Sequence, residues 1–181
     1  MQGSRRLLAV LTLALLPTIL AAQSPPDAPP FTQRSQAAWL NSEPLTMAEL
    51  RGRVLLVDFW TFGCWNCYRS FPWLLSLEQR LADEAFTVIS VHSPEFEHEH
   101  DIGKVREQAA KFGLTHPIMI DNDFAYWQAM NNRYWPTYYL IDAEGRIRDT
   151  FIGETHAGQK QALAIEAKLI ALLNEAKKDE N

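Results

Sequence analysis

The sequence predicts an α/β fold in three layers, with helices on both faces of a mixed central sheet. Three observations lead to this prediction. Apolar, β-prone runs alternate with helix-like segments along residues 54–130, as in a sheet whose inner strands are parallel. Residues 54–60 are apolar almost throughout, which is typical of a strand covered on both faces. Residues 137–152 read as strand, turn and strand, which adds antiparallel strands to the sheet.

The remaining elements follow from periodicity and from glycine and proline positions. Strands are expected at residues 36–40 (a short edge strand), 54–60, 86–91, 117–121, 137–142 and 146–152. Helices are expected from the cysteines to residue 80 or 81, and at 102–112, 124–130 and 157–177. Pro72 should kink the first of these helices, and Gly113 should end the second. Thr46 and Glu49 have the spacing of a capping box, which predicts one further helical turn at residues 45–50.

Composition narrows the function classes. The chain has 181 residues, of which 47% are hydrophobic and 22% charged, values typical of one soluble globular domain. A net charge of −5 argues against a nucleic-acid partner, which would require a basic surface. The two cysteines are too few for a disulfide framework or for a thiolate zinc site.

The N-terminal residues have the pattern of an export signal. Arg5 and Arg6 precede an apolar run at residues 7–20, and Ala21 and Ala22 offer small residues for cleavage. We therefore expect a signal peptide at residues 1–22 and a periplasmic or secreted mature protein. A retained membrane anchor at residues 7–20 is the alternative. The expected order then continues with a proline-rich spacer at 23–35, one folded domain at 36–177 and a flexible tail at 178–181.

The two cysteines, Cys64 and Cys67, lie three residues apart, between the expected strand 54–60 and the helix that follows. The unpaired N–H groups and the dipole at a helix N-terminus favour a thiolate there. A purely structural disulfide is the alternative. A bridge across only two residues closes a very small loop and removes little chain entropy, so it would stabilise the fold poorly. The spacing therefore favours dithiol–disulfide chemistry.

These features together resemble the thioredoxin superfamily, within it the exported TlpA-like branch, and most of all the periplasmic thioredoxin-like domain of DipZ proteins. The resemblance spans about residues 37–173. It is carried by Val57-Asp58-Phe59-Trp60, Cys64-Trp65-Asn66-Cys67, Pro72, Ser93-Pro94-Glu95-Phe96, Asp121-Asn122-Asp123, Arg133-Tyr134-Trp135-Pro136, Leu140-Ile141-Asp142-Ala143-Glu144-Gly145 and Gly153-Glu154.

The resemblance and the local chemistry assign roles to three residues. Cys64, at the start of the helix, is expected to be the exposed nucleophile, and Cys67, one turn later, the buried resolving thiol. Asp58 matches the buried acid of the family. Burial in an apolar strand should raise its pKa, so that it can accept the proton of Cys67. A hydrogen-bonded Asp58 with only a structural role is the alternative.

The resemblance also implies a substrate groove beside the cysteines. Pro136 matches the cis-proline of the family, although an ordinary trans proline at the start of a strand remains the alternative. A cis bond would present the backbone of Trp135 to an extended substrate. Trp65 and Trp135 are expected to contact substrate, whereas Trp60 by default belongs to the core.

The predicted function is that of an exported thiol-disulfide oxidoreductase acting through a mixed disulfide, with the Cys64–Cys67 disulfide as its redox centre and no other cofactor. Because Trp65 and Asn66 between the cysteines carry no positive charge, we favour a reductase over a strong oxidant. Expected partners are disulfide-bearing exported proteins and, from the resemblance, an electron donor in the membrane. The direction of electron flow, the client, the donor and the oligomeric state stay open.

A metal-binding protein is the alternative function. His92, His98 and His100 lie among four acids at residues 92–101, and imidazole and carboxylate groups bind transition metals. Together with the Cys pair they would suit copper binding or delivery. We favour a solvated acidic loop and helix entry for this segment, and we assign no metal ligand.

Overall fold

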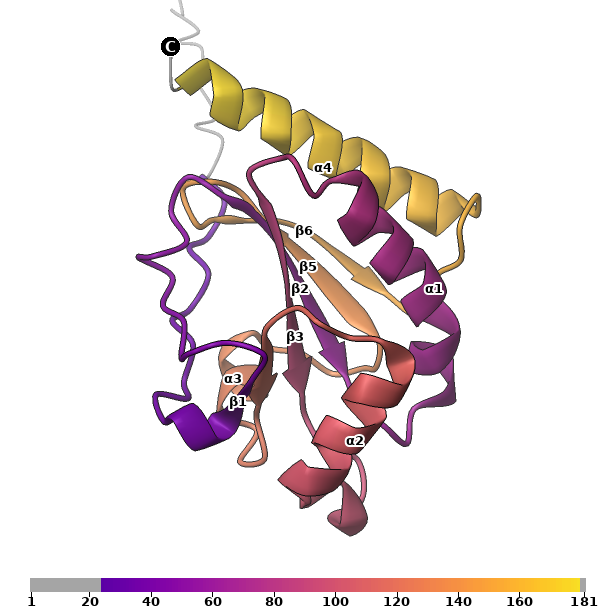
Figure 1. The fold of residues 1–181 in the computed structure, drawn as a ribbon. Helices are drawn as coiled ribbons and strands as arrows, with labels where there is room; N and C mark the ends of the chain where they lie inside the picture. Colours follow the sequence, from indigo (N-terminus) through magenta and orange to yellow (C-terminus); the bar gives the residue numbers. More distant parts are fainter. Residues whose placement is uncertain (1–23, 180–181) are drawn as a thin grey trace, which may run out of the picture.

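The computed structural model describes residues 24–179 and shows a sheet with helices packed against it (Figure 1). The strands of the described chain are β1 Trp39–Leu40, β2 Val54–Trp60, β3 Phe86–His92, β4 Ile118–Ile120, β5 Thr137–Ile141 and β6 Ile147–Ile152. Its α-helices are α1 Trp65–Arg80, α2 Ile102–Phe112, α3 Ala125–Ala129 and α4 Lys160–Asp179, with 3-10 turns η1 Gln36–Ala38 and η2 Glu97–His100. Each predicted strand, and each predicted helix except the single turn at residues 45–50, is present within a few residues of its expected bounds.

The sheet has the strand order β1-β4-β3-β2-β5-β6 and is mixed, as predicted. The inner strands β2, β3 and β4 are parallel, whereas β1, β5 and β6 run antiparallel to their neighbours. Strand β2 lies inside the sheet and all seven of its residues are buried, which explains its nearly continuous apolar sequence. Its register places Asp58 between Ser90 of β3 and Tyr138 of β5.

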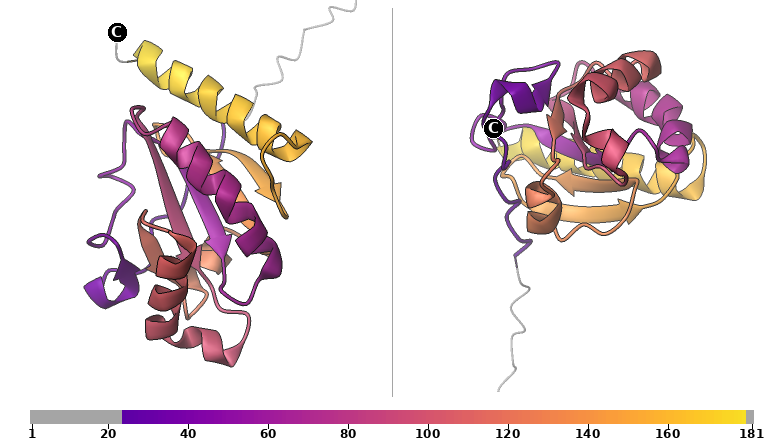
Figure 2. Two further views of the ribbon diagram at one scale, coloured as in Figure 1. Left: turned by 45° about the vertical axis from the view of Figure 1, so that its right-hand side comes forward. Right: turned by 90° about the horizontal axis from the view of Figure 1, so that it is seen from below.

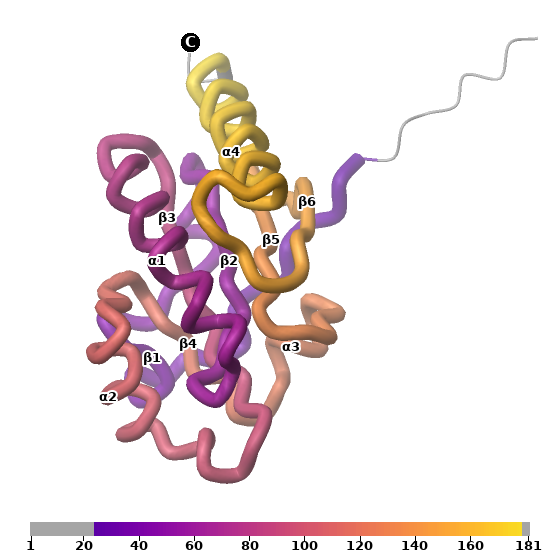
Figure 3. Tube along the Cα trace, turned by 90° about the vertical axis from the view of Figure 1, so that its right-hand side faces the viewer, coloured from indigo at the N-terminus to yellow at the C-terminus, as the bar shows by residue number. Residues whose placement is uncertain are grey.

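The two faces of the sheet carry separate hydrophobic cores. Helices α1, α2 and α4 cover one face, where Leu74, Val105 and Leu169 are fully buried (Figures 1 and 3). The short helix α3 and the chain before β2 cover the other face (Figure 2). This confirms the predicted three-layer α/β/α architecture. The second outer layer consists largely of irregular chain.

The segment predicted as a proline-rich spacer packs against this second face. The Pro26 carbonyl accepts a hydrogen bond from the Ile147 N–H at 2.8 Å, and the Ala28 N–H donates to the Gly145 carbonyl at 2.8 Å. Phe31 is buried against Trp39 with ring centroids 5.5 Å apart. The packed structure therefore begins before residue 36, the predicted start of the domain.

At the chain ends, helix α4 continues to Asp179, so residues 178 and 179 of the predicted flexible tail are helical. The predicted signal peptide and its cleavage site at residues 1–22 lie outside the described residues. Over residues 24–179, no helix combines the length and the apolar character needed to cross a membrane.

Residues 45–50 differ from the prediction. The Thr46 and Glu49 side chains exchange the hydrogen bonds of a capping box, at 2.9 Å and 3.2 Å to the two backbone N–H groups. The backbone nevertheless forms turns instead of a helix. Gly52 follows with φ +83° and the chain enters β2 at Val54. Too few residues therefore remain for the capped turn to extend into a helix.

Candidate active site

The two cysteines form a disulfide at the N-terminus of α1, with their Cα atoms 5.3 Å apart. Cys64 is the N-cap residue, and its sulfur accepts a hydrogen bond from the Cys67 N–H at 3.2 Å. Cys64 retains 9% of its exposure while Cys67 retains none. A thiolate at Cys64 would thus meet both solvent and the unpaired N–H groups of the first helical turn.

Asp58 lies on β2 and is 1% exposed. Burial raises the pKa of this carboxyl to about 7, although a hydrogen bond from the Ser90 hydroxyl, at 3.3 Å, acts in the opposite direction. Within residues 24–179, the second carboxylate oxygen, Oδ1, has no hydrogen-bond partner. A carboxyl in these surroundings can change protonation state near neutral pH, which suits the proton acceptor predicted from the sequence.

A groove of about 340 Å³ opens beside the disulfide. Cys64, Trp65 and Trp135 line it, with Gly63, Asn66, Glu95, Arg133 and Tyr134. The Trp135–Pro136 peptide bond is cis, as the resemblance implied. Trp65 is 67% exposed, whereas Trp60 is fully buried against His92 and Phe71. The structure therefore brings Trp65 and Trp135 together at Cys64 and places Trp60 in the core.

Hydrogen bonds hold the turn that carries Trp135. The Thr137 hydroxyl donates to the Tyr134 carbonyl at 2.8 Å, and the Asn132 amide donates to the same carbonyl at 3.1 Å. The buried Tyr139 hydroxyl in turn donates to the Asn132 side-chain oxygen at 3.2 Å. One wall of the groove is thus anchored to the centre of β5.

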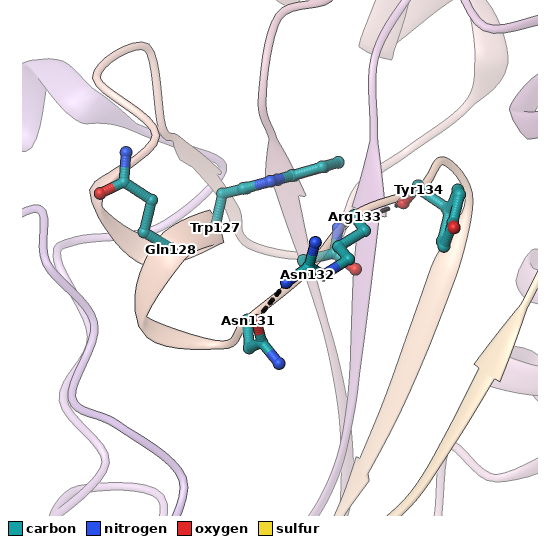
Figure 4. Close-up of a pocket in the computed structure, with 6 residues that line it drawn as sticks. All are labelled: Trp127, Gln128, Asn131, Asn132, Arg133 and Tyr134. Atoms are coloured by element: carbon teal, nitrogen blue, oxygen red, sulfur yellow. Dashed lines mark hydrogen bonds between the residues drawn. The ribbon is translucent and has the colours of Figure 1, made fainter.

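A second hollow, of about 580 Å³, continues from this wall and is shown in Figure 4. Trp127 of α3 lines it, and its ring lies 4.3 Å from that of Trp135. Arg133 and Tyr134 line both hollows. The surface next to Cys64 is therefore an extended, aromatic-rich depression whose lining includes the cation Arg133.

Glu99, in η2, is a site residue that the sequence did not single out. It was grouped with the acids of a solvated loop, but it is fully buried and accepts hydrogen bonds from the N–H groups of Gly63, Glu95 and Phe96. Burial alone would raise its pKa, but these bonds and one from Thr61 together lower it. Glu99 therefore ties the turn before Cys64 to the loop after β3.

His92 at the end of β3 and His98 and His100 in η2 have different surroundings. His92 is buried, its ring stacked on Phe62 at 5.7 Å, and burial lowers its pKa to about 4. His98 packs against Phe62 and Phe96, while the His100 carbonyl accepts a bond from Asn122. In the described part of the chain, no group of three or more His, Cys, Asp or Glu side chains is arranged to hold a metal ion.

Comparison with known proteins agrees with this geometry. The Redoxin family model matches residues 23–165. Protein DipZ of Mycobacterium tuberculosis is 40% identical over 142 residues, which are 77% of this chain and 20% of DipZ. The chain thus spans about a fifth of that relative. Thiol-disulfide oxidoreductase YkuV of Bacillus subtilis is 36% identical over 114 residues, 62% of this chain and 76% of YkuV.

Solved structures show the same fold. A thioredoxin-like protein solved in solution in its oxidised form superposes with a TM-score of 0.69 at 31% identity, covering 83% of this chain and 97% of that one. A secreted Mycobacterium tuberculosis disulfide oxidoreductase superposes with a TM-score of 0.60 at 20% identity, covering 77% and 96%. The chain therefore belongs to the Redoxin family, among the thioredoxin-like relatives of thiol-disulfide oxidoreductase YkuV, and it is similar to DipZ over about a fifth of that protein.

Proposed function

We propose that the chain acts outside the cytoplasm as a reductase of disulfides in exported proteins. The observation that carries the proposal is the Cys64–Cys67 disulfide at the N-terminus of α1, open to a groove whose far wall is Trp135 beside cis-Pro136. Groove and sulfur together suit an extended peptide that carries its own disulfide.

In the proposed reaction the reduced protein supplies two electrons. The Cys64 thiolate attacks one sulfur of the target disulfide, and the other target sulfur leaves as a thiolate. Cys67 then gives its proton to Asp58 and attacks the Cys64 sulfur of the mixed disulfide. The Cys64–Cys67 bond forms, and the second target sulfur leaves as a thiolate. The target gains the electron pair that the dithiol loses, and reversal of the same steps gives oxidation.

The groups around Cys64 support electron transfer from the protein to the target disulfide. Trp65 and Asn66 between the sulfurs are uncharged, so only the helix N-terminus favours the thiolate from within the motif. Glu99 adds a negative charge behind Gly63, which disfavours a second negative charge nearby. A less stabilised thiolate corresponds to a more reducing couple. Reduction then requires an outside electron source, for which we propose a membrane donor.

A glutathione redox titration followed by tryptophan fluorescence tests this function. A reversible two-electron couple near −270 mV, the value of thioredoxin, would support a reductase, whereas a value near −120 mV would mark an oxidant and overturn the direction. The Cys64→Ser and Cys67→Ser proteins should show no transition. If the unaltered protein never forms a reversible Cys64–Cys67 disulfide, the proposed chemistry is wrong.

A further inference from the structure

Four polar side chains form a continuous hydrogen-bonded chain that starts at the buried Asp58. Asp58 Oδ2 lies 3.3 Å from the Ser90 hydroxyl. That hydroxyl lies 2.8 Å from Nε2 of His116, and Nδ1 of His116 lies 3.0 Å from Oε2 of Glu78. The chain crosses from β2 to β3, then to the loop before β4, and ends on α1.

The outer end of this chain reaches solvent. The Glu78 side chain keeps 30% of its exposure, while that of His116 keeps 1%. Glu78 also lines a surface hollow of about 450 Å³ between α1 and the end of α2. Ser90 is fully buried. The path therefore begins in the core, at the carboxyl proposed to take the proton of Cys67, and ends at water on the flank of α1.

The backbone fixes the two inner links. Ser90 is the direct partner of Asp58 in the β2–β3 register, and its N–H donates to the Pro117 carbonyl at 3.0 Å. The Asn41 side chain donates to the His116 carbonyl at 2.9 Å and to the Leu114 carbonyl at 3.0 Å. The loop that carries His116 is thus tied down on both sides of the imidazole.

The donor and acceptor roles along the chain can shift together. A protonated Asp58 donates to Ser90, whose hydroxyl then donates to Nε2 of a neutral His116, while Nδ1–H donates to Glu78. An ionised Asp58 accepts from Ser90, which then accepts from Nε2–H of an imidazolium. The two arrangements differ only by one proton, moved from Asp58 to His116 through the hydroxyl.

We propose that Ser90, His116 and Glu78 conduct to solvent the proton that Asp58 takes from Cys67. The inference rests on the proposed dithiol chemistry and adds to it the route by which the buried acid is reset. One proton enters at Asp58 when Cys67 attacks the mixed disulfide, and one leaves the imidazolium by way of Glu78. No electrons move along the path, and reversal delivers a proton to Cys67.

The surroundings of Asp58 suit this role. Burial raises its pKa to about 7, so the carboxyl gives up as well as accepts a proton near neutral pH. Tyr138, its neighbour on β5, has a pKa raised further still by burial and by the charge of Asp58, and so keeps its proton. At 1% exposure, Asp58 itself exchanges poorly with bulk water.

The test measures the resolving step directly. Reduced protein is mixed with excess oxidised glutathione, and the unimolecular formation of the Cys64–Cys67 disulfide is followed by tryptophan fluorescence. Glu78→Gln, Ser90→Ala and His116→Gly should each slow this step about tenfold, since positioned proton transfer contributes factors of at least this size. Free imidazole should restore the rate of His116→Gly alone. Glu107→Gln, an acid-to-amide change on the exposed face of α2, should leave the rate unchanged.

Two further readouts separate proton conduction from structural damage. The glutathione redox titration of Glu78→Gln and His116→Gly should give the potential of the unaltered protein, because a conducting path changes rates and not equilibria. Thermal unfolding identifies any variant that has lost its fold. Glu78→Gln changes a partly exposed side chain at the outer end of the path, so this variant is expected to keep its fold.

The proposal is overturned if Glu78→Gln resolves as fast as the unaltered protein, or if imidazole leaves His116→Gly slow. If Ser90→Ala is the only slow variant, Ser90 acts on Asp58 itself, and the proton leaves through the active-site groove instead of through His116 and Glu78. Failure of the proposed function itself looks different, because the unaltered protein would then form no Cys64–Cys67 disulfide at all.

Discussion

Asp58 is a carboxyl placed in the middle of the most deeply buried strand, and that position has a thermodynamic cost. Ionising it inside the fold requires a charge to leave water, and the Ser90 hydroxyl compensates only in part. Groups with perturbed pKa values concentrate at functional sites. The unfavourable burial of Asp58 therefore fits the catalytic role proposed for it, which would outweigh its cost in stability.

The stability of the oxidised protein should depend on pH through Asp58. The pKa is raised from 3.8 to about 7, so the folded state holds the proton more tightly than the unfolded state. Stability linked to this group is complete below about pH 4 and is lost as the pH rises to about 7. Asp58→Asn should thus gain on the order of 2–4 kcal/mol at pH 8 and little at pH 4.

Urea unfolding of the oxidised proteins at both pH values measures this gain. Asp83→Asn, an acid-to-amide change in the exposed turn after α1, is the matched control and should show no such pH dependence. Equal stability of Asp58→Asn and the unaltered protein at pH 8 would contradict the assigned pKa. The same variant should also lose most of its rate in the resolving step, since the proposed proton acceptor is gone.

The sequence indicated four candidate site residues by two routes. The spacing of Cys64 and Cys67 at the start of a helix pointed to dithiol chemistry, whereas the expectations for Asp58 and Pro136 came from the family resemblance. Ser90, His116 and Glu78 gave no such signal. They belong to a strand, a loop and a helix, and only the β2–β3 register and the packing of α1 bring them together.

At the scale of elements, the loop after β3 and the turn before Cys64 form one unit through Glu99. The carboxylate accepts from three backbone N–H groups, and a Cβ on Gly63 would lie 2.2 Å from its Oε1. A side chain at position 63 would therefore displace the Glu99 carboxylate from this contact. The sequence suggested only a solvated acidic segment, because Glu97 and Glu99 are the same residue type and nothing in the sequence shows that Glu97 is exposed while Glu99 is buried.

Glu99→Ala should destabilise the protein by about 2–4 kcal/mol at neutral pH, since it leaves backbone donors in the core without an acceptor. Because the hydrogen bonds lower the pKa of Glu99 below 4.5, the stability it contributes is present above that pH and is lost as the pH falls through the lowered value. The deficit should therefore shrink in acid. Urea unfolding curves measure it, with Glu97→Ala in the same 3-10 turn as control. A deficit no larger than that of the control would show that the hydrogen bonds of Glu99 do not stabilise the fold.

The turn at residues 45–50 shows a limit of local signals. Thr46 and Glu49 make the hydrogen bonds of a helix start, yet the chain must enter β2 only a few residues later. A capping pattern predicts where a helix can begin, whereas the distance to the next strand decides whether it does.

At the scale of the whole molecule, the fold is held by two cores on opposite faces of one sheet. The core under α1, α2 and α4 could be foreseen from helical periodicity. The second core depends on Trp39 and on Phe31, and Phe31 lies in a stretch without regular periodicity where a proline-rich spacer was expected. Proline-rich composition does not reveal that an isolated aromatic side chain docks into the fold.

Phe31→Ala should cost about 3–5 kcal/mol, because it leaves a cavity between Trp39 and Tyr126. Ile170→Ala, which truncates an exposed apolar side chain of α4, should change stability by less than about 0.5 kcal/mol. Chemical unfolding of the oxidised proteins compares the two. Equal, small losses would show that the chain before residue 36 is dispensable, as the predicted domain boundary implied.

The contact of Pro26 and Ala28 with the β5–β6 turn also sets the orientation of the molecule toward anything joined upstream. That turn lies beside the start of β2, where Leu55 pairs with Ile141, whereas Cys64 follows the far end of the same strand. A linker attached ahead of residue 24 would enter at the pole opposite the disulfide. If the protein is tethered through this end to a neighbouring domain or a surface, its disulfide faces away from the attachment point. The proposed client and the proposed electron donor can then reach the disulfide in turn.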